Sequence, residues 1–196
     1  MKEVNKLLFH PLERFSTDYL LVFGLIGLVI GGILGSFFSA HYDGVFDLHF
    51  ASNVLWWEPF LENMLSALCL FSILYLTANF LFPVSIKKFL AFTLTARYPL
   101  YLLTFTNINN LNYETGQILF SNPIDLEKQI PMDSVILSVV FGALSIIALI
   151  WMLVLVFNGF KKVTRTKGIP LIIGFIIGII VSELISRFIF LSLFQG

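Results

Sequence analysis

A small set of charged and amide side chains lies inside apolar stretches of this sequence. Arg97 stands in the run SIKKFLAFTLTARYPLYLLTF (85–105), two residues before Pro99. Glu183 and Arg187 are four residues apart, the favourable order for an ion pair on one helix face. A charge within a bilayer is costly unless it faces a partner or water. We therefore expect an intramembrane polar cluster, whose members are Arg97, Glu183, Arg187, Asn63 and Asn79.

Two roles are open for this cluster. It fixes the register of the helices, or it lines a polar path through the membrane, since charges at such depth mark function by default. Pro99 adds another partner for Arg97, because a proline cannot donate a backbone hydrogen bond and so frees the carbonyl of Thr95.

A second group with chemical potential is the near-palindrome HYDGVFDLHF. Its polar members are His41, Asp43, Asp47 and His49, and imidazole with carboxylate suits zinc or manganese. No HExxH or cysteine pair accompanies them, so a hydrated polar loop is the preferred interpretation and no metal or cofactor is predicted. The chain also lacks GxSxG, P-loop and GxGxxG signatures, so we expect no enzyme.

The composition indicates what must position these side chains. Of 196 residues, 58% are hydrophobic and 12% charged, against about 45–50% and 25% in soluble domains. These values are typical of an integral membrane protein. The formal net charge of zero gives no reason to expect a nucleic-acid partner.

Five segments have the length and apolar character of transmembrane helices, which need about 20 residues. The predicted fold is an all-α, polytopic transmembrane bundle of one domain, 19–191. Its spans are 19–40, 61–82, 89–107, 135–157 and 169–191. Residues 1–18 are predicted to form an interfacial cytoplasmic tail, and 108–132 a long external loop that covers a cavity, contacts a partner or acts as a tether.

The distribution of Lys and Arg predicts the orientation. Nine lie in the tail and the second and fourth connections, whereas the first and third connections hold only Lys128. The N-terminus is therefore predicted to be cytoplasmic and the C-terminus outside. The basic cytoplasmic loop comprises Lys161, Lys162, Arg165 and Lys167.

Small residues at four-residue spacing mark two spans. The first carries Gly27, Gly31 and Gly35, continued by Ser39, and the last carries Gly174, Gly178 and Ser182, continued by Ser186. Such stripes let helix backbones approach closely in lipid. Packing within the chain is the preferred interpretation, and a homodimer is the alternative.

Three stretches together resemble the Yip family of five-span membrane proteins, including its bacterial members. They are LLFHPLERF before the first span, SIKKFLAFTLTARYPLYLL with its Tyr98-Pro99 pair, and WMLVLVFNGFKKVTRTKGIP with Gly159 and the basic loop. The resemblance runs from Leu7 to Leu191. It implies a non-enzymatic protein in trafficking or membrane organisation.

These observations predict a multi-pass protein of a bacterial inner membrane that organises lipids or protein partners. Its expected partners are membrane lipids and a membrane or cytosolic protein that meets the basic loop. The alternative is a small transporter or channel component in which Arg97 and Glu183 line the path.

Overall fold

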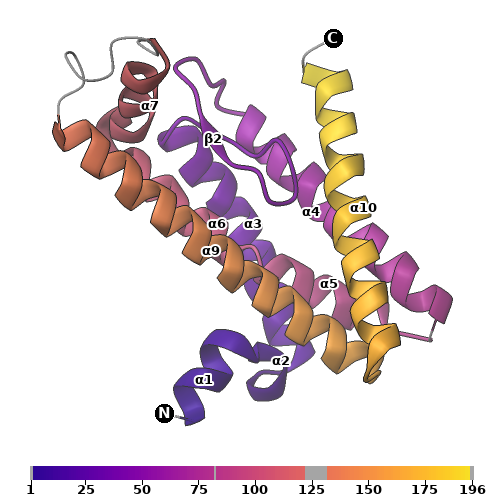
Figure 1. Ribbon diagram of the computed structural model, residues 1–196. Helices are drawn as coiled ribbons and strands as arrows, with labels where there is room; N and C mark the ends of the chain where they lie inside the picture. The colour runs from indigo at the N-terminus through magenta and orange to yellow at the C-terminus, as the bar shows by residue number, and fades with distance from the viewer. Residues whose placement is uncertain (1, 82, 122–131, 195–196) are drawn as a thin grey trace.

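Helices account for nearly all of the chain in the computed structural model, which describes residues 2–81, 83–121 and 132–194 (Figure 1). Two short strands pair as an antiparallel hairpin, with Ala40 opposite Phe50 and His41 opposite His49. The elements in chain order are α1 (Lys2–Phe9), α2 (Pro11–Arg14), α3 (Thr17–Phe37), β1 (Ala40–His41), β2 (His49–Phe50), α4 (Glu58–Leu81), α5 (Ile86–Thr95), α6 (Tyr98–Leu103), the 3-10 helix η1 (Thr104–Asn110), α7 (Leu111–Ser121), α9 (Met132–Thr164) and α10 (Ile169–Phe194).

Four of the five predicted spans coincide with helices long and apolar enough to cross a membrane, namely α3, α4, α9 and α10. Helix α3 ends three residues before its predicted end, because Ser39 has a φ of 53° and turns the chain into β1. Ser39 therefore does not continue the glycine stripe. Helix α9 is longer than predicted, with 33 residues or about 50 Å. A helix of that length fits a bilayer when tilted, and Figure 1 shows α9 inclined across the bundle.

The predicted third span is not one helix. It is divided into α5, α6 and η1, with the first break at Ala96 and Arg97. Pro99 lies in the first turn of α6 and cannot donate to the carbonyl of Thr95, so the α-helical ladder cannot continue through it. Hydrogen bonds between residues three apart span the break, from Arg97 N to Leu94 O and from Leu100 N to Arg97 O.

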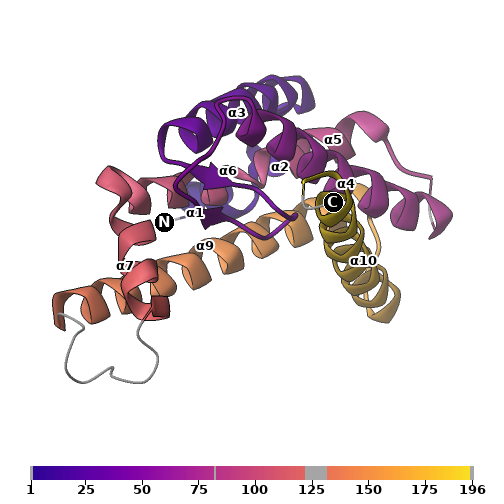
Figure 2. The same cartoon turned by 90° about the horizontal axis from the view of Figure 1, so that it is seen from above.

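This broken segment runs through the middle of the bundle. Seen from above in Figure 2, α6 lies between α3 and α9. The last five residues of α5, from Ala91 to Thr95, are all buried, and so is Ala96 at the break. Phe89, Phe92 and Leu100 pack with Met152 and Val156 of α9 in the main hydrophobic core. Irregular backbone at membrane depth is tolerated where protein surrounds it, and this segment meets that condition.

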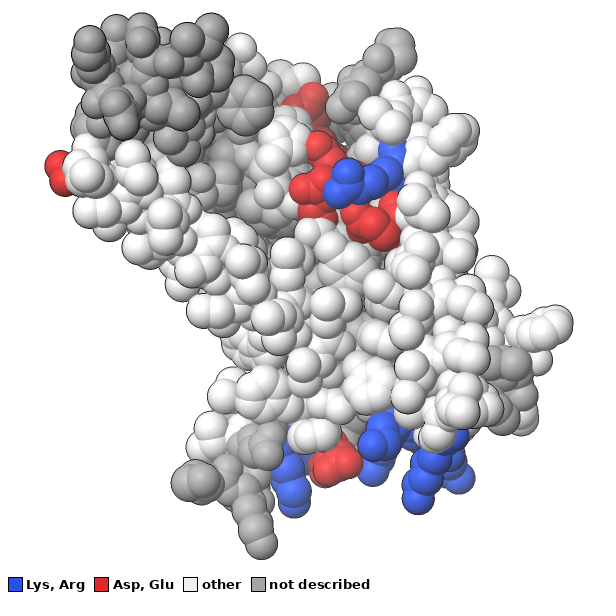
Figure 3. Space-filling view, in the orientation of Figure 1, with Lys and Arg blue, Asp and Glu red and all other residues white. Residues whose placement is uncertain are grey.

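The outward faces of the long helices are strongly apolar. Residues at least half exposed include Val22, Ile26, Ile33, Ile146, Ile150, Ile180 and Leu184. Figure 3 shows an uncharged band between charged groups at the two ends. Soluble monomers rarely expose a contiguous apolar surface of this extent. The chain is therefore an integral membrane protein.

Both stripes of small residues are used for packing within the chain. A Cβ on Gly27 would meet Tyr98, and one on Gly31 would lie 2.4 Å from Tyr101. On the other stripe, a Cβ on Gly178 would lie 2.6 Å from Leu74 of α4. Gly35, Gly174, Ser182 and Ser186 are buried as well. These faces of α3 and α10 therefore pack against other segments of the same chain, and the homodimer stays a prediction.

Two predicted non-spanning regions contain helices. The tail forms α1 and α2, separated before Pro11, and is fixed to α9 by hydrogen bonds from Trp151 to Leu8 O and from Asn158 to Phe9 O. The expected loop 108–132 is wrong over its first part, which forms the end of η1 and α7, and Met132 begins α9. Residues 122–131 lie outside the described residues.

The packing of α3 predicts a sharp difference between two glycines. Gly31→Ala should lower the free energy of unfolding by about 1–3 kcal/mol, because its Cβ overlaps the Tyr101 ring and the Asn63 amide. Gly142→Ala in α9 has open space within 4 Å and should be neutral or stabilising by up to about 1 kcal/mol. Unfolding in detergent, followed by circular dichroism, measures both. Equal stability of Gly31→Ala and the parent would contradict this packing.

Candidate functional site

Arg97 is the largest of the completely buried side chains among the described residues, with 0% exposure. Its guanidinium is the charged group at the centre of the candidate site. It donates from Nε to Asn63 Oδ1 at 3.1 Å, from Nη1 to Val45 O at 3.2 Å and from Nη2 to Ser66 Oγ at 2.7 Å. We call Arg97, its three partners and Tyr101 the Arg97 network. All three guanidinium nitrogens therefore have protein acceptors.

Two separate segments supply these acceptors. Asn63 and Ser66 are one turn apart on α4, and Val45 lies in the connection between β1 and β2. Asn63 ties the network together, because its Oδ1 also accepts from the Tyr101 hydroxyl and its Nδ2 donates to Leu28 O of α3. The break after α5 places Arg97 where it reaches all of them.

The expected direct pairing of Arg97 with Glu183 is wrong. The acceptors of Arg97 are an amide oxygen, a hydroxyl and a backbone carbonyl, with no carboxylate among them. The carbonyl of Thr95, the other predicted partner, is not among them either. A carboxylate beside a buried guanidinium would itself need desolvation, whereas neutral acceptors avoid that cost.

Glu183 and Arg187 do pair, as the four-residue spacing predicted, with 2.7 Å between Oε1 and Nε. Arg187 also meets Asp47 at 2.9 Å. The other oxygen of Glu183 accepts from the backbone of Phe46 at 3.1 Å. These charges gather near the upper end of the molecule in Figure 3.

The peptide of Val45 joins the two polar groups. Its carbonyl accepts from Arg97, and its N–H donates to the hydroxyl of Ser186 on α10 at 3.2 Å. The predicted cluster is therefore two groups linked through the hairpin connection. Asn79 belongs to neither, because it is exposed near the opposite end of α4.

The hairpin brings together a second polar group, which we call the hairpin cluster: His41, Asp43, His49 and Glu62. His41 Nδ1 lies 2.7 Å from Glu62 Oε1, and His49 Nδ1 lies 2.7 Å from Asp43 Oδ2. The two imidazole rings stack with centroids 5.1 Å apart. The hydrogen bond with Glu62 raises the pKa of His41, against the opposing effect of burial. Of the four predicted ligands, Asp47 is absent from this cluster because it pairs with Arg187.

Glu62 and Ser66 were missed by the reasoning from sequence. Glu62 is only 2% exposed, and its second oxygen accepts from Tyr42 N at 2.9 Å. Glu62 precedes Asn63 at the start of a predicted span. A carboxylate at the end of a span is usually exposed at the membrane surface, so its position gave no sign of burial. A usable signal was the spacing, since Glu62 and Ser66 are four residues apart and share one helix face with Asn63 beside it.

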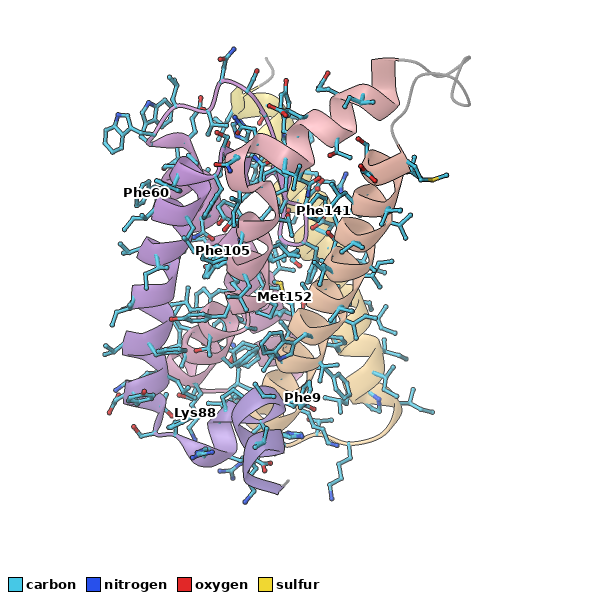
Figure 4. All side chains as sticks on the ribbon, turned by 90° about the vertical axis from the view of Figure 1, so that its left-hand side faces the viewer. Phe9, Phe60, Lys88, Phe105, Phe141 and Met152 are labelled. Atoms are coloured by element: carbon cyan, nitrogen blue, oxygen red, sulfur yellow. The ribbon has the colours of Figure 1, made fainter. Side chains whose placement is uncertain are left out.

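The end of the bundle that carries the N-terminus holds a cavity of about 580 Å³, which we call the basic cavity. Its charged lining consists of Lys88, Lys161, Lys162, Arg165, Lys167 and Glu13. Glu13 lies 3.7 Å from Lys162, and the other four cations make no ion pair with the described part of the chain. Figure 4 places Lys88 and Phe9 at this end.

Comparisons with known proteins returned no matching family model, curated protein or solved structure. The resemblance to the Yip family therefore stays a prediction.

The Arg97 network predicts that charge alone does not satisfy this position. Arg97→Lys keeps the charge but lacks the planar fork that reaches three acceptors, so it should lower the free energy of unfolding by about 2–3 kcal/mol. Arg187→Lys, at a half-exposed ion pair, should cost less than about 1 kcal/mol. Denaturant unfolding in one detergent compares them. A cost for Arg97→Lys no larger than that for Arg187→Lys would contradict the network.

Proposed function

We propose that this protein is a non-enzymatic, multi-pass membrane protein that binds the phosphate headgroup of an anionic lipid in its basic cavity. The observation that carries the proposal is a group of four cations around one cavity that have no ion-pair partner among the described residues, namely Lys88, Lys161, Arg165 and Lys167. Cations left unpaired beside a membrane surface favour an anionic ligand.

The remaining lining suits a lipid better than a free ion. Leu12, Phe15 and Val163 give the cavity an apolar side, and Ser16 and Thr17 add hydroxyl groups. A headgroup with its glycerol backbone needs both kinds of surface. Basic pockets between transmembrane helices are a recognised form of lipid-binding site.

The same end of the molecule is proposed to face the cytoplasm. Lys87, Lys88 and the basic loop lie there with the tail, as the excess of Lys and Arg requires of a cytoplasmic side. The broken α5–α6 segment then completes a fifth passage through the membrane. The lipid would link the tail, α5 and the α9–α10 connection, which is a role in organising the membrane around the protein.

The alternative, a transporter or channel built on Arg97 and Glu183, is less well supported by the geometry. Arg97 is fully buried and uses its donors on protein acceptors. Neither Arg97 nor Glu183 lines the basic cavity. We propose that the Arg97 network is architectural.

Lipid binding should depend on the cavity cations. The double variant Lys161→Gln, Lys167→Gln should weaken binding of phosphatidylglycerol or cardiolipin about 30-fold, because each cation near an anionic surface contributes about 1 kcal/mol. Native mass spectrometry of the purified protein, titrated with each lipid, measures the bound fraction. Phosphatidylcholine serves as the zwitterionic comparison.

Lys87→Gln is the matched control, because Lys87 lies at the same end but pairs with Asp18 and does not line the cavity. It should bind anionic lipid within about two-fold of the parent. Competition with inorganic phosphate separates a headgroup from a free anion: a lipid site keeps its lipid at millimolar phosphate. Equal lipid binding by the double variant and the parent would remove the proposal.

A further inference from the structure

We infer that the hairpin cluster is a binding site for a divalent transition-metal ion, with His41, Asp43 and Glu62 as ligands. One ligand atom from each of these three residues lies within 4.8 Å of the other two. The site is at the opposite end of the bundle from the basic cavity and does not depend on lipid binding. It differs from the set predicted from sequence, because Glu62 replaces Asp47.

The distances fit a shared ion after small side-chain movements. Two ligands at about 2.1 Å from a tetrahedral zinc ion lie about 3.4 Å apart. His41 Nδ1 and Glu62 Oε1 are at 2.7 Å, so they would separate slightly and exchange their shared proton for the ion. The ligand atom of Asp43 already lies within 4.8 Å of the other two and would close the remaining distance to the ion. Each movement is within the range of a side-chain rotation.

The ligands are held by the fold before any ion binds. Glu62 is 2% exposed and fixed by Tyr42 N, which leaves Oε1 directed at His41. His41 is held in β1, paired across the hairpin with His49. His49 in turn holds Asp43 through Oδ2, the way outer histidine and carboxylate partners orient metal ligands.

Charge and ligand type narrow the ion. Two carboxylates and a neutral imidazole carry a charge that matches a divalent cation. Imidazole nitrogen with carboxylate oxygen suits zinc or manganese, whereas calcium and magnesium prefer oxygen alone. An ion can reach the site from solvent, because the side chains of Asp43 and His41 are 29% and 17% exposed.

A bound ion would clamp the hairpin onto α4. The same connection contains Val45, whose carbonyl accepts a hydrogen bond from Arg97, and Phe46, whose N–H donates to Glu183. Binding at His41, Asp43 and Glu62 would therefore stabilise the segment that covers the Arg97 network. The expected consequence is a more stable bundle in the presence of the ion.

Zinc titration of the full chain tests the inference, using an affinity tag without histidine and chelator-treated protein in detergent. Isothermal calorimetry should show one Zn²⁺ per chain, and a hundred-fold excess over Kd should raise Tm by about 5–10 °C. Co²⁺ should give d–d absorption bands in the visible range. Glu62→Gln and His41→Gln should each weaken binding at least 10-fold.

Asp47→Asn is the matched control, since Asp47 lies in the same connection but pairs with Arg187, and it should bind within two-fold of the parent. If burial prevents Glu62→Gln from folding, Asp43→Asn provides the test, because Asp43 is 29% exposed and should fold while losing affinity. No saturable binding by the parent up to 1 mM Zn²⁺ would overturn the inference. Parent-like affinity in both His41→Gln and Asp43→Asn would overturn it equally.

Discussion

A permanent positive charge buried in the middle of the bundle constrains the whole structure. The guanidinium of Arg97 carries N–H donors and no acceptor, so the fold must bring acceptors to it. The acceptors come from α4 and from the connection between the strands, and Tyr101 and Leu28 O complete the network. Pro99 would remove a backbone hydrogen bond from an uninterrupted helix, so it favours the break between α5 and α6. Arg97 lies at this break, within reach of its acceptors. Charge, proline and helix break therefore form one feature.

The connection of residues 42–47 has a structural weight that its length does not suggest. Tyr42 donates to Gly31 O, Val45 links Arg97 to Ser186, and Phe46 donates to Glu183. Glycine at position 44 allows this close contact, since a Cβ there would lie 3.0 Å from Glu183 Oε1. The connection is thus hydrogen-bonded to α3, α4 and α10, and to Arg97 at the start of α6, at one end of the bundle. Any event that holds it in place, including occupation of the hairpin cluster, stabilises all four helices.

The long elements could be predicted from sequence because apolar length is a strong local signal. Apolar length predicted four of the spans. The Glu183–Arg187 pair could also be predicted, because it depends only on spacing along one helix. The partners of Arg97 could not be predicted in this way. Val45 contributes a backbone carbonyl, which has no signature in the sequence, and Ser66 is a common residue in membrane helices. Glu62 is the second residue of a predicted span, and its burial could not be predicted because it depends on the hairpin, which folds back over it.

The distribution of unsatisfied groups separates architecture from interaction. In the interior every polar atom of the Arg97 network has a protein partner, and no buried side-chain donor or acceptor among the described residues is left unpaired. The two ends of the bundle differ from this interior. At one end, four cations around a cavity have no ion-pair partner in the part of the chain that the structure describes, and at the other, imidazoles lie beside carboxylates near solvent. The two proposed sites thus lie at opposite ends of the bundle, the basic cavity at the end that carries α1 and the hairpin cluster at the end that carries β2 in Figure 1, and the helices between them hold each set of side chains together.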